Sequence, residues 1–299
     1  MTIRFGVSPI AWINDDMPEL GGDTPVEQVL ADARDIGFAG VELGGKFPRD
    51  PVALRSLLGR YCLALIGGWY SANLLTRSAE EEIAALADHL ALLQALGCEV
   101  FVIAETSNAI HGAREKPLNQ SPRLELDAWK RFGERLTKVA DFVGRSGLRL
   151  AYHHHLGTIV EDASELDQFL SVTGDAVGLT LDTGHAALGG VDPLAVLRTA
   201  PGRVAHVHCK DIRRAVFDAN VTAGRSFLDG VLAGMFTVPG DGDLRFTGLM
   251  QSLAGIGYSG WVVVEAEQDP AVADPSRNAE LGLATLRRDA TAAGLKEAA

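Results

Sequence analysis

The sequence predicts an α/β protein folded as a closed (β/α)8 TIM barrel, and three observations support this prediction. Short apolar runs alternate with longer amphipathic runs along the whole 299-residue chain. The apolar runs are hydrophobic almost throughout, which is typical of parallel strands buried on both faces. No Pro/Ser-rich linker divides the chain, and barrels of about 200–250 residues form one domain. We therefore expect a single barrel over residues 1–299, with a frayed tail near 291–299; an open doubly wound sheet is the alternative.

The expected elements follow from apolar runs and from helix start signals. The strands are expected at residues 3–8, 40–43, 63–67, 99–104, 148–153, 177–182, 204–208 and 261–265. The helices are expected at residues 25–36, 51–59, 79–96, 125–146, 163–171, 193–199, 246–256 and 275–294. Asp50, Asp192 and Asp274 each precede a proline and are expected to cap a helix. Capping boxes are expected at Ser78 and Thr24 because a glutamate follows each residue after three positions.

Charge and cysteine content narrow the class of protein. The net charge is −12, which opposes a nucleic-acid or anionic-membrane partner because both require a basic surface. Cys62, Cys98 and Cys209 do not form a zinc-finger pattern and suit a reducing compartment. We expect Cys62 and Cys98 in the core and Cys209 in a structural role. No apolar run reaches the ~18 residues of a membrane span, and no leader is visible, so we expect a cytoplasmic protein.

Polar side chains close several of the apolar strands. In a barrel of this type the active site lies at the carboxyl ends of the strands. Polar groups there are costly to bury unless they are paired or bound to a metal ion. The strand ends carry Glu42, His153, His154, His155, Asp182, His185, His206, His208, Lys210, Glu265 and Glu267.

The three successive histidines are expected to divide between two faces. Alternation along a strand points His153 and His155 one way and His154 the other. One strand-five histidine, with Asp182, His208 and Glu265 from other strands, makes a mixed oxygen and nitrogen site. Such ligands suit Mn²⁺, Co²⁺, Fe²⁺ or Zn²⁺, and the missing cysteine ligand argues against a structural zinc site.

Structural roles compete with these functional ones. Asp182 could cap the turn that follows it, and His206 could be a packed barrel histidine. Glu42 and Glu267 could instead form salt bridges with a lysine or arginine.

Other residues are candidates for a substrate pocket. Trp12 and Trp69 are expected just beyond the first and third strands and could line a pocket for a hydroxylated ring. Lys46 could donate hydrogen bonds to substrate hydroxyls. The polar segment 106–124, which contains His111, is long enough to be functional or mobile. The sequence has no dinucleotide fingerprint and no GxxxxGK[ST] phosphate loop.

Three strand-end motifs resemble those of the xylose-isomerase-like superfamily of metal-dependent barrels. They are LDTGH at 181–185, HVHCKD at 206–211 and WVVVE at 261–265. The superfamily includes sugar isomerases, sugar epimerases and apurinic endonucleases. More closely, the whole chain resembles the inosose dehydratase family, at residues 6–25, 40–50, 152–158, 181–186, 206–211, 236–243 and 263–270.

This resemblance implies a metal site and a reaction. It assigns Asp182, His208 and Glu265 as metal ligands. His153 stands where many members have a glutamate, so His155 remains an alternative fourth ligand. The implied enzyme is a hydro-lyase of inositol catabolism that dehydrates 2-keto-myo-inositol (inosose) to a trihydroxycyclohexane-1,2-dione. Mn²⁺ or Co²⁺ is expected in preference to Fe²⁺ or Zn²⁺.

Roles for the remaining residues follow from that reaction. His155 and Glu267 are the expected proton-transfer pair. His185 and Lys210 would orient substrate oxygens, and Glu42 and His206 would contact the substrate together with Lys46, Trp12 and Trp69. No redox cofactor is needed, because the dehydration is internally redox-neutral.

Three rival functions remain open. A ketose epimerase or sugar isomerase would use the same metal and return the proton without losing hydroxide. An apurinic endonuclease-like DNA repair protein is disfavoured by the acidic charge. A non-catalytic sugar-binding protein would not need so many inward carboxylates and histidines. The expected partner is a small polyol ketone, and a homo-oligomer is compatible with the sequence.

Overall fold

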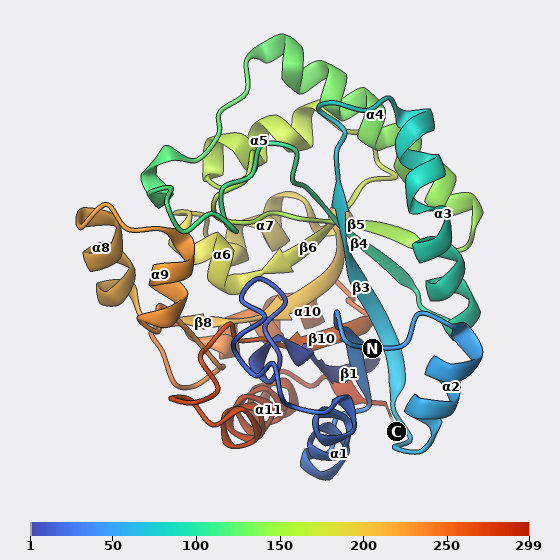
Figure 1. Cartoon of the computed structure of the whole chain (residues 1–299), viewed down its shortest axis with the longest axis vertical. Helices are drawn as coiled ribbons and strands as arrows, with labels where there is room; N and C mark the ends of the chain where they lie inside the picture. The colour runs from blue at the N-terminus through green and yellow to red at the C-terminus, as the bar shows by residue number, and fades with distance from the viewer. Residues whose placement is uncertain (1, 299) are drawn as a thin grey trace.

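The computed structural model describes residues 2–298, which form a closed barrel of eight parallel strands surrounded by helices (Figure 1). Neighbouring strands pair in chain order, and β10 pairs with β1 to close the barrel. The barrel strands are β1 (Thr2–Val7), β2 (Gly40–Leu43), β3 (Ala64–Ala72), β4 (Val100–Glu105), β5 (Arg149–His153), β6 (Gly178–Asp182), β7 (Val204–Cys209) and β10 (Gly260–Val264). This closure confirms the predicted barrel and excludes the open sheet.

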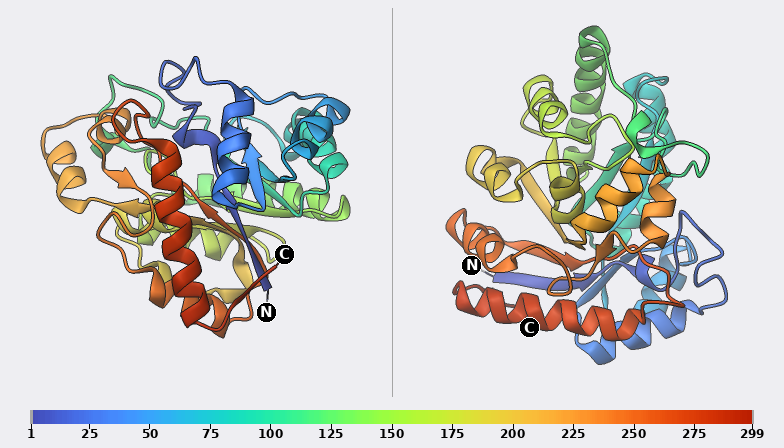
Figure 2. Two further views of the ribbon diagram at one scale, coloured as in Figure 1. Left: turned by 90° about the horizontal axis from the view of Figure 1, so that it is seen from below. Right: turned by 90° about the vertical axis from the view of Figure 1, so that its left-hand side faces the viewer.

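All eight expected helices are present, with ends within two residues of the predicted ones. They are α1 (Val26–Ile36), α2 (Pro51–Gly59), α3 (Ala79–Leu96), α4 (Leu126–Arg145), α5 (Ala163–Val172), α7 (Pro193–Thr199), α10 (Phe246–Gly255) and α11 (Pro275–Ala292). The last helix, α11, packs against both α10 and α1, so it completes the outer ring (Figure 2). No helix within residues 2–298 is both long enough and apolar enough to cross a membrane.

The helix caps agree with the sequence in four of five places. The carboxylates of Asp50, Asp192 and Asp274 accept backbone hydrogen bonds in the first turns of α2, α7 and α11. Ser78 and Glu81 form the complete capping box of α3. The expected box at Thr24 is absent, because α1 starts one residue later with Pro25 at the cap and no side-chain bond.

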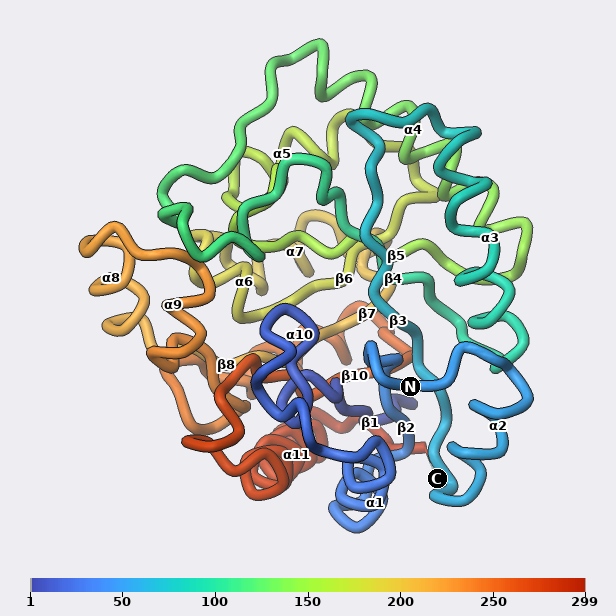
Figure 3. Tube along the Cα trace, in the orientation of Figure 1, coloured from blue at the N-terminus to red at the C-terminus, as the bar shows by residue number. Residues whose placement is uncertain are grey.

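Several short elements were not predicted. They are α6 (Thr183–Leu188), α8 (Arg214–Thr222), α9 (Phe227–Leu232), three 3-10 helices η1 (Pro9–Ala11), η2 (Leu118–Gln120) and η3 (Pro201–Arg203), an antiparallel pair β8 (Asp211–Ile212) and β9 (Phe236–Thr237), and β11 (Lys296–Glu297). Within the tail that was expected to fray, β11 pairs with β1, so Thr2 lies beside Lys296. Figure 3 traces the chain from β1 in blue to this tail in red.

The segments beyond the carboxyl ends of the strands share a second hydrophobic cluster, which we call the roof cluster. It joins loops that follow five different strands with the helix α9. Its buried members are Met17, Leu118, Leu156, Leu188, Ile212, Phe227, Leu228, Val231, Met235 and Phe236. Hydrophobic burial therefore holds together loops that have little regular structure of their own.

Inside the barrel, the half near the amino ends of the strands is apolar, and the half near their carboxyl ends is polar. Trp261, Ile66 and Val263 form one buried cluster within the barrel. A methyl group added to Gly40 would lie 2.7 Å from the Trp261 ring and 2.9 Å from the carbonyl oxygen of Ala64. Glycine at position 40 thus leaves the space that the Trp261 side chain fills.

Two of the three cysteines lie where the sequence predicted. Cys98 and Cys209 are buried, and no disulfide involves any of the three. Cys62 is exposed and has a positive φ of 56°, because it stands in the turn between α2 and β3. The expectation that Cys62 is a core residue is therefore wrong.

Substitution at Gly40 tests the packing of the barrel interior. We expect Gly40→Ala to lower the free energy of unfolding by about 1–3 kcal/mol, because the added methyl overpacks the barrel. Gly144→Ala is the matched control, since nothing lies within 4 Å of that site on α4. It should leave the stability unchanged or raise it by up to about 1 kcal/mol. Urea unfolding of both variants measures this, and equal effects would contradict the packing.

Candidate metal centre and active site

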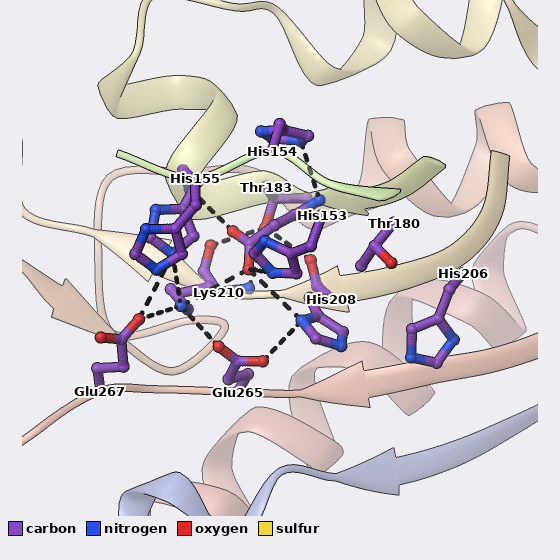
Figure 4. A network of polar contacts seen from close by, with 12 residues as sticks. His153, His154, His155, Thr180, Thr183, His206, His208, Lys210, Glu265 and Glu267 are labelled. Atoms are coloured by element: carbon purple, nitrogen blue, oxygen red, sulfur yellow. Dashed lines mark hydrogen bonds and ion pairs between the residues drawn. The ribbon is translucent and has the colours of Figure 1, made fainter. Parts of the chain in front are cut away.

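Strand register brings the predicted polar residues together at one end of the barrel. Asp182 on β6 is paired with His208 on β7, and Val263 on β10 is paired with the same histidine. His153 ends β5, next to β6. Glu265 immediately follows β10. Side chains from four strands therefore point into one small volume (Figure 4).

His153, Asp182 and His208 form a compact group of metal-ligand atoms. The Oδ2 atom of Asp182 lies 3.7 Å from Nε2 of His153 and 3.7 Å from Nδ1 of His208. The Oε2 atom of Glu265 lies 2.7 Å from the same Nδ1 atom. Ligands bound at about 2.0–2.2 Å from one ion lie roughly 3–3.6 Å apart. The two 3.7 Å distances come close to this range, whereas Glu265 is paired directly with His208 at 2.7 Å. His153, Asp182 and His208 are therefore the residues whose spacing suits a shared divalent cation.

The carboxylate of Asp182 gives an independent test of that fit. Its Oδ1 atom accepts a 2.8 Å hydrogen bond from the backbone of His185 and caps α6. Its Oδ2 atom is buried and has no hydrogen-bond partner among residues 2–298. A buried carboxylate oxygen without a donor is unfavourable by about 1–3 kcal/mol or more. Asp182 therefore serves as a helix cap and also presents an oxygen that a cation would satisfy.

The other two histidines of the triplet point elsewhere. His154 lies on the opposite face of the strand, as expected, where its Nε2 atom accepts a 3.4 Å hydrogen bond from the backbone of Asp182. The Nδ1 atom of His155 lies 2.7 Å from the carbonyl oxygen of Leu156, and its ring stacks on His185 at 3.8 Å. Of the two alternatives for a strand-five ligand, His153 is the one grouped with Asp182.

Glu42 links the candidate ligand His208 to His206. Its Oε1 atom lies 2.9 Å from Nε2 of both histidines. Burial raises the pKa of Glu42, but the two histidines lower it further, so the carboxyl stays ionised. A histidine that binds a metal commonly donates its other ring N–H to a carboxylate, which fixes the tautomer. Glu42 is placed to do this for His208.

His206 does not lie where a substrate-contacting residue was expected. It sits one layer lower in the barrel, is fully buried and does not line the cavity above the site (Figure 4). Its polar contact with the site is the one to Glu42, and its ring packs against that of His208 with centroids 5.0 Å apart.

Lys210 stands at the centre of the acidic groups. Its Nζ atom lies 2.7 Å from Glu265 Oε1 and 2.6 Å from Glu267 Oε1. Burial favours the neutral amine, but Asp182, Glu265 and Glu267 together raise the pKa of Lys210 above its ordinary value. A methyl group on Gly184 would lie 2.8 Å from Cγ of Lys210, so glycine there leaves room for the lysine stem.

The pair His155 and His185 is held neutral. Burial, and then the neighbouring histidine or Lys210, lowers the pKa of both rings well below the ordinary value. Because Nδ1 of His155 faces a carbonyl oxygen, its proton belongs there and Nε2 is free to accept one. Burial raises the pKa of Glu267, but Lys210 and His155 lower it below its usual value.

A cavity of about 640 Å³ opens above these groups. Volumes of about 300–1,000 Å³ are typical of small-molecule sites. Trp69 lines the cavity from within β3, 39% exposed, and its ring meets that of His153 at 5.3 Å. Lys46 also lines it, while its Nζ atom donates to the carbonyl oxygens of Gly22 and Thr24.

Trp12 differs from the expectation. It is 2% exposed, belongs to the main hydrophobic core, and donates its indole N–H to Asp32. It does not line the cavity, because it follows the short helix η1 and its indole is directed to Asp32 on α1. That Trp12 follows a strand in the sequence did not show in which direction its side chain points.

Some cavity residues were not predicted, namely Asn14, Asp15 and Asp16 from the loop after β1. His111, which also lines the cavity, comes from the segment 106–124 that the sequence marked as functional or mobile. The sequence signal was available, since both loops follow carboxyl ends of strands, where barrel sites lie. The polar residues after β1 simply stand farther from the strand end than those of the other strands.

Comparison of the sequence with known families agrees with the barrel fold described above. The chain belongs to the xylose isomerase-like TIM barrel family, whose pattern matches residues 30–289. Among its relatives, the rhizopine catabolism protein MocC of Rhizobium meliloti is 47% identical over 99% of this chain and 91% of that protein. The inosose dehydratase of Lacticaseibacillus casei is 40% identical over 92% of this chain and 93% of that protein.

Solved structures agree on the fold. The D-psicose 3-epimerase of Clostridium cellulolyticum H10 superposes with a TM-score of 0.68 and covers 96% of this chain and 99% of that one. The sequences are 18% identical, so this likeness concerns the fold alone.

The link between Glu42 and His208 predicts an effect on metal affinity. We expect Glu42→Gln to weaken Mn²⁺ binding about 10–100-fold, because the neutral amide orients the His208 imidazole less firmly than the negatively charged carboxylate does. Isothermal titration of the metal-free protein with Mn²⁺ measures this. The matched control is Glu80→Gln, on the exposed face of α3, which should bind Mn²⁺ like the wild type. Unchanged affinity in Glu42→Gln would contradict the role of this carboxylate.

Proposed function

We propose that the protein is a metal-dependent hydro-lyase that removes water from 2-keto-myo-inositol (inosose) to give a trihydroxycyclohexane-1,2-dione. The observation that carries this proposal is the buried group of His153, Asp182 and His208, with Glu265 paired to His208, beside a cavity that His153, His208 and Glu265 line. The 40% identity to inosose dehydratases along nearly the whole chain supports this particular reaction.

The substrate is a β-hydroxyketone, so its dehydration requires two events. A proton leaves the carbon next to the ketone, and a hydroxyl leaves one carbon farther along. A divalent ion, Mn²⁺ or Co²⁺ in preference to Fe²⁺ or Zn²⁺, would supply Lewis-acid polarisation of the ketone when held by the four ligands. The chain's own residues must then bind the ring, orient its oxygens and move the protons.

His155 suits the role of base. Its ring is neutral, and the nitrogen that does not face Leu156 is free to take a proton. Glu267 lies in the same group as His155 and His185, and its Oε2 atom has no hydrogen-bond partner among the described residues. We assign these two as the proton-transfer pair.

Lys210 and His185 would stabilise negative charge on substrate oxygens. The cationic Lys210 Nζ lies 3.1 Å from His185 Nε2, so both groups sit at the same edge of the metal ligands. Trp69, which is 39% exposed and lines the cavity, offers an apolar surface on which a face of the substrate ring could pack. General acid–base catalysis contributes about 10²–10⁴-fold to such a reaction.

A second candidate comes from the relative at 47% identity. Its name refers to rhizopine catabolism, so the natural substrate here could belong to that process and use the same site. An efficient kcat/KM with inosose, within the usual range of about 10⁴–10⁸ M⁻¹s⁻¹, would favour the first candidate. A sugar epimerase with the same barrel fold remains the alternative that would catalyse a different class of reaction.

Product absorbance tests the proposed reaction. We expect Mn²⁺-loaded protein to generate ultraviolet absorbance from inosose, because dehydration makes a conjugated enol-dione. A chelator should abolish the signal, and added Mn²⁺ should restore it. A change in the ring stereochemistry of inosose, seen by nuclear magnetic resonance and without a chromophore, would indicate epimerisation and would refute the dehydration.

Removal of His208 tests the metal site itself. We expect His208→Ala to lose both bound metal, measured by elemental analysis, and turnover, because the ligand group loses its central imidazole. His89→Ala is the control, since that half-buried histidine contacts Gly68 on the outside of the barrel. It should keep its metal. Normal activity of chelator-treated His208→Ala would refute the proposed mechanism.

A further inference from the structure

The loop between β1 and α1 covers one side of the cavity and has a fixed shape. Oδ1 of Asn14 accepts hydrogen bonds from the backbone of Asp16 and Met17, at 2.9 and 2.8 Å. The Met17 side chain is buried in the roof cluster. Gly21 has a φ of 71° and lies against the carbonyl oxygen of Trp12, where a methyl group would not fit. These contacts fix where the Asp16 side chain can lie.

Asp16 is the acidic residue of the cavity wall that has no partner. Neither of its carboxyl oxygens takes part in a hydrogen bond or ion pair within residues 2–298, although the residue is only partly exposed. By contrast, both oxygens of Asp15 accept from the backbone of Gly45, at 3.1 and 3.0 Å. Glu42 and Glu265 are likewise held by histidines or Lys210. Asp16 is therefore free to contact a molecule in the cavity.

The proposed elimination needs an acid as well as a base. The departing hydroxyl would leave as hydroxide, which is a poor leaving group unless a proton reaches its oxygen. Glu267 is paired with Lys210 and is held as a carboxylate. His155 is held neutral and its one N–H faces a backbone carbonyl. In that state the pair can take the proton from the substrate carbon, but neither group carries a proton that faces the cavity and could be given to the departing hydroxyl.

The surroundings of Asp16 allow it to carry a proton in a substantial fraction of molecules near neutral pH. Burial, followed by the negative charges of Glu267 and Asp15, raises the pKa of Asp16 to about 7. Lys210 opposes this rise, and Glu265 adds to it. An acid is most effective when its pKa lies near the working pH.

We propose that Asp16 is a catalytic residue that donates its proton to the hydroxyl leaving the substrate. This inference rests on the proposed dehydration. After the proton next to the ketone has passed to the base, the electron pair of that C–H bond forms the new C=C bond. The C–O bond breaks with its electron pair on oxygen, the Asp16 proton joins that oxygen, and water departs. Asp16 remains as a carboxylate and regains a proton from solvent as the base releases one.

Solvent exchange separates the two halves of the reaction. In D₂O, Asp16→Asn should still incorporate deuterium next to the ketone within about tenfold of the wild-type rate, because the base is untouched. Its dehydration rate should fall by about 10²–10⁴-fold. Nuclear magnetic resonance of the remaining inosose and product absorbance give the two rates on the Mn²⁺-loaded enzyme. Equal losses of both rates, or no loss of dehydration, would overturn the assignment.

Glu19→Gln is the matched control on the same loop. Glu19 is an exposed residue that pairs with Arg114 at 2.8 Å and does not line the cavity. Its amide variant should show both rates within about threefold of the wild type, since general surface pairs contribute little. A loss of dehydration alone in this variant would point to loop disturbance and would overturn the role of Asp16.

The pH dependence gives a second readout. The proton on Asp16 is present below its pKa and is lost as the pH rises, so wild-type kcat/KM should fall above about pH 7. Asp16→Asn should lack this alkaline limb. If the wild type neither dehydrates nor exchanges inosose, the proposed function fails. The carboxyl ¹³C resonance of Asp16 then decides the inference separately, because a midpoint at the ordinary value of about 4 would overturn it.

Discussion

The need to compensate buried negative charge is the constraint on which the rest of this structure depends. Asp182, Glu265 and Glu267 are buried around a single lysine, Lys210, and Glu42 is buried beside two histidines. Each buried ion carries a desolvation penalty of several kcal/mol, so such a group is stable only with closely placed positive charge. Lys210 supplies part of this charge and lies 3.6 Å from Oδ2 of Asp182, but that oxygen has no hydrogen-bond donor among the described residues, and we propose that a second cation would satisfy it.

The apolar parts of the chain keep these charged residues together at one end of the barrel. Apolar side chains such as Trp261 and Ile66 fill the lower barrel, where glycine at position 40 makes room for them. The polar residues are thereby confined to the carboxyl end. Above them the roof cluster holds loops from several strands, which excludes water from the lysine and carboxylates and strengthens their interactions.

Much of the fold was predictable, because hydrophobic runs and helix caps are local signals. The location of the polar cluster was also predictable, since the carboxyl ends of parallel strands meet at one end of a barrel. Depth within the barrel was not predictable: His206 and His208 share a face, yet only His208 reaches the ligand group. The directions of Trp12 and Asp16 depend on η1 and on the Asn14 turn, which are local structures, but hydrophobicity and strand position alone do not show on which side they place these two side chains. The short helices α8 and α9 bury their apolar residues only against the roof cluster and other loops.

The central claim is that side chains from four strands hold one divalent cation. Anomalous diffraction from a crystal of the Mn²⁺-loaded protein tests it most directly. The account predicts one strong peak at about 2.0–2.3 Å from ligand atoms of His153, Asp182, His208 and Glu265. A peak among His155, His185 and Glu267 instead, or no peak at this end of the barrel, would contradict it.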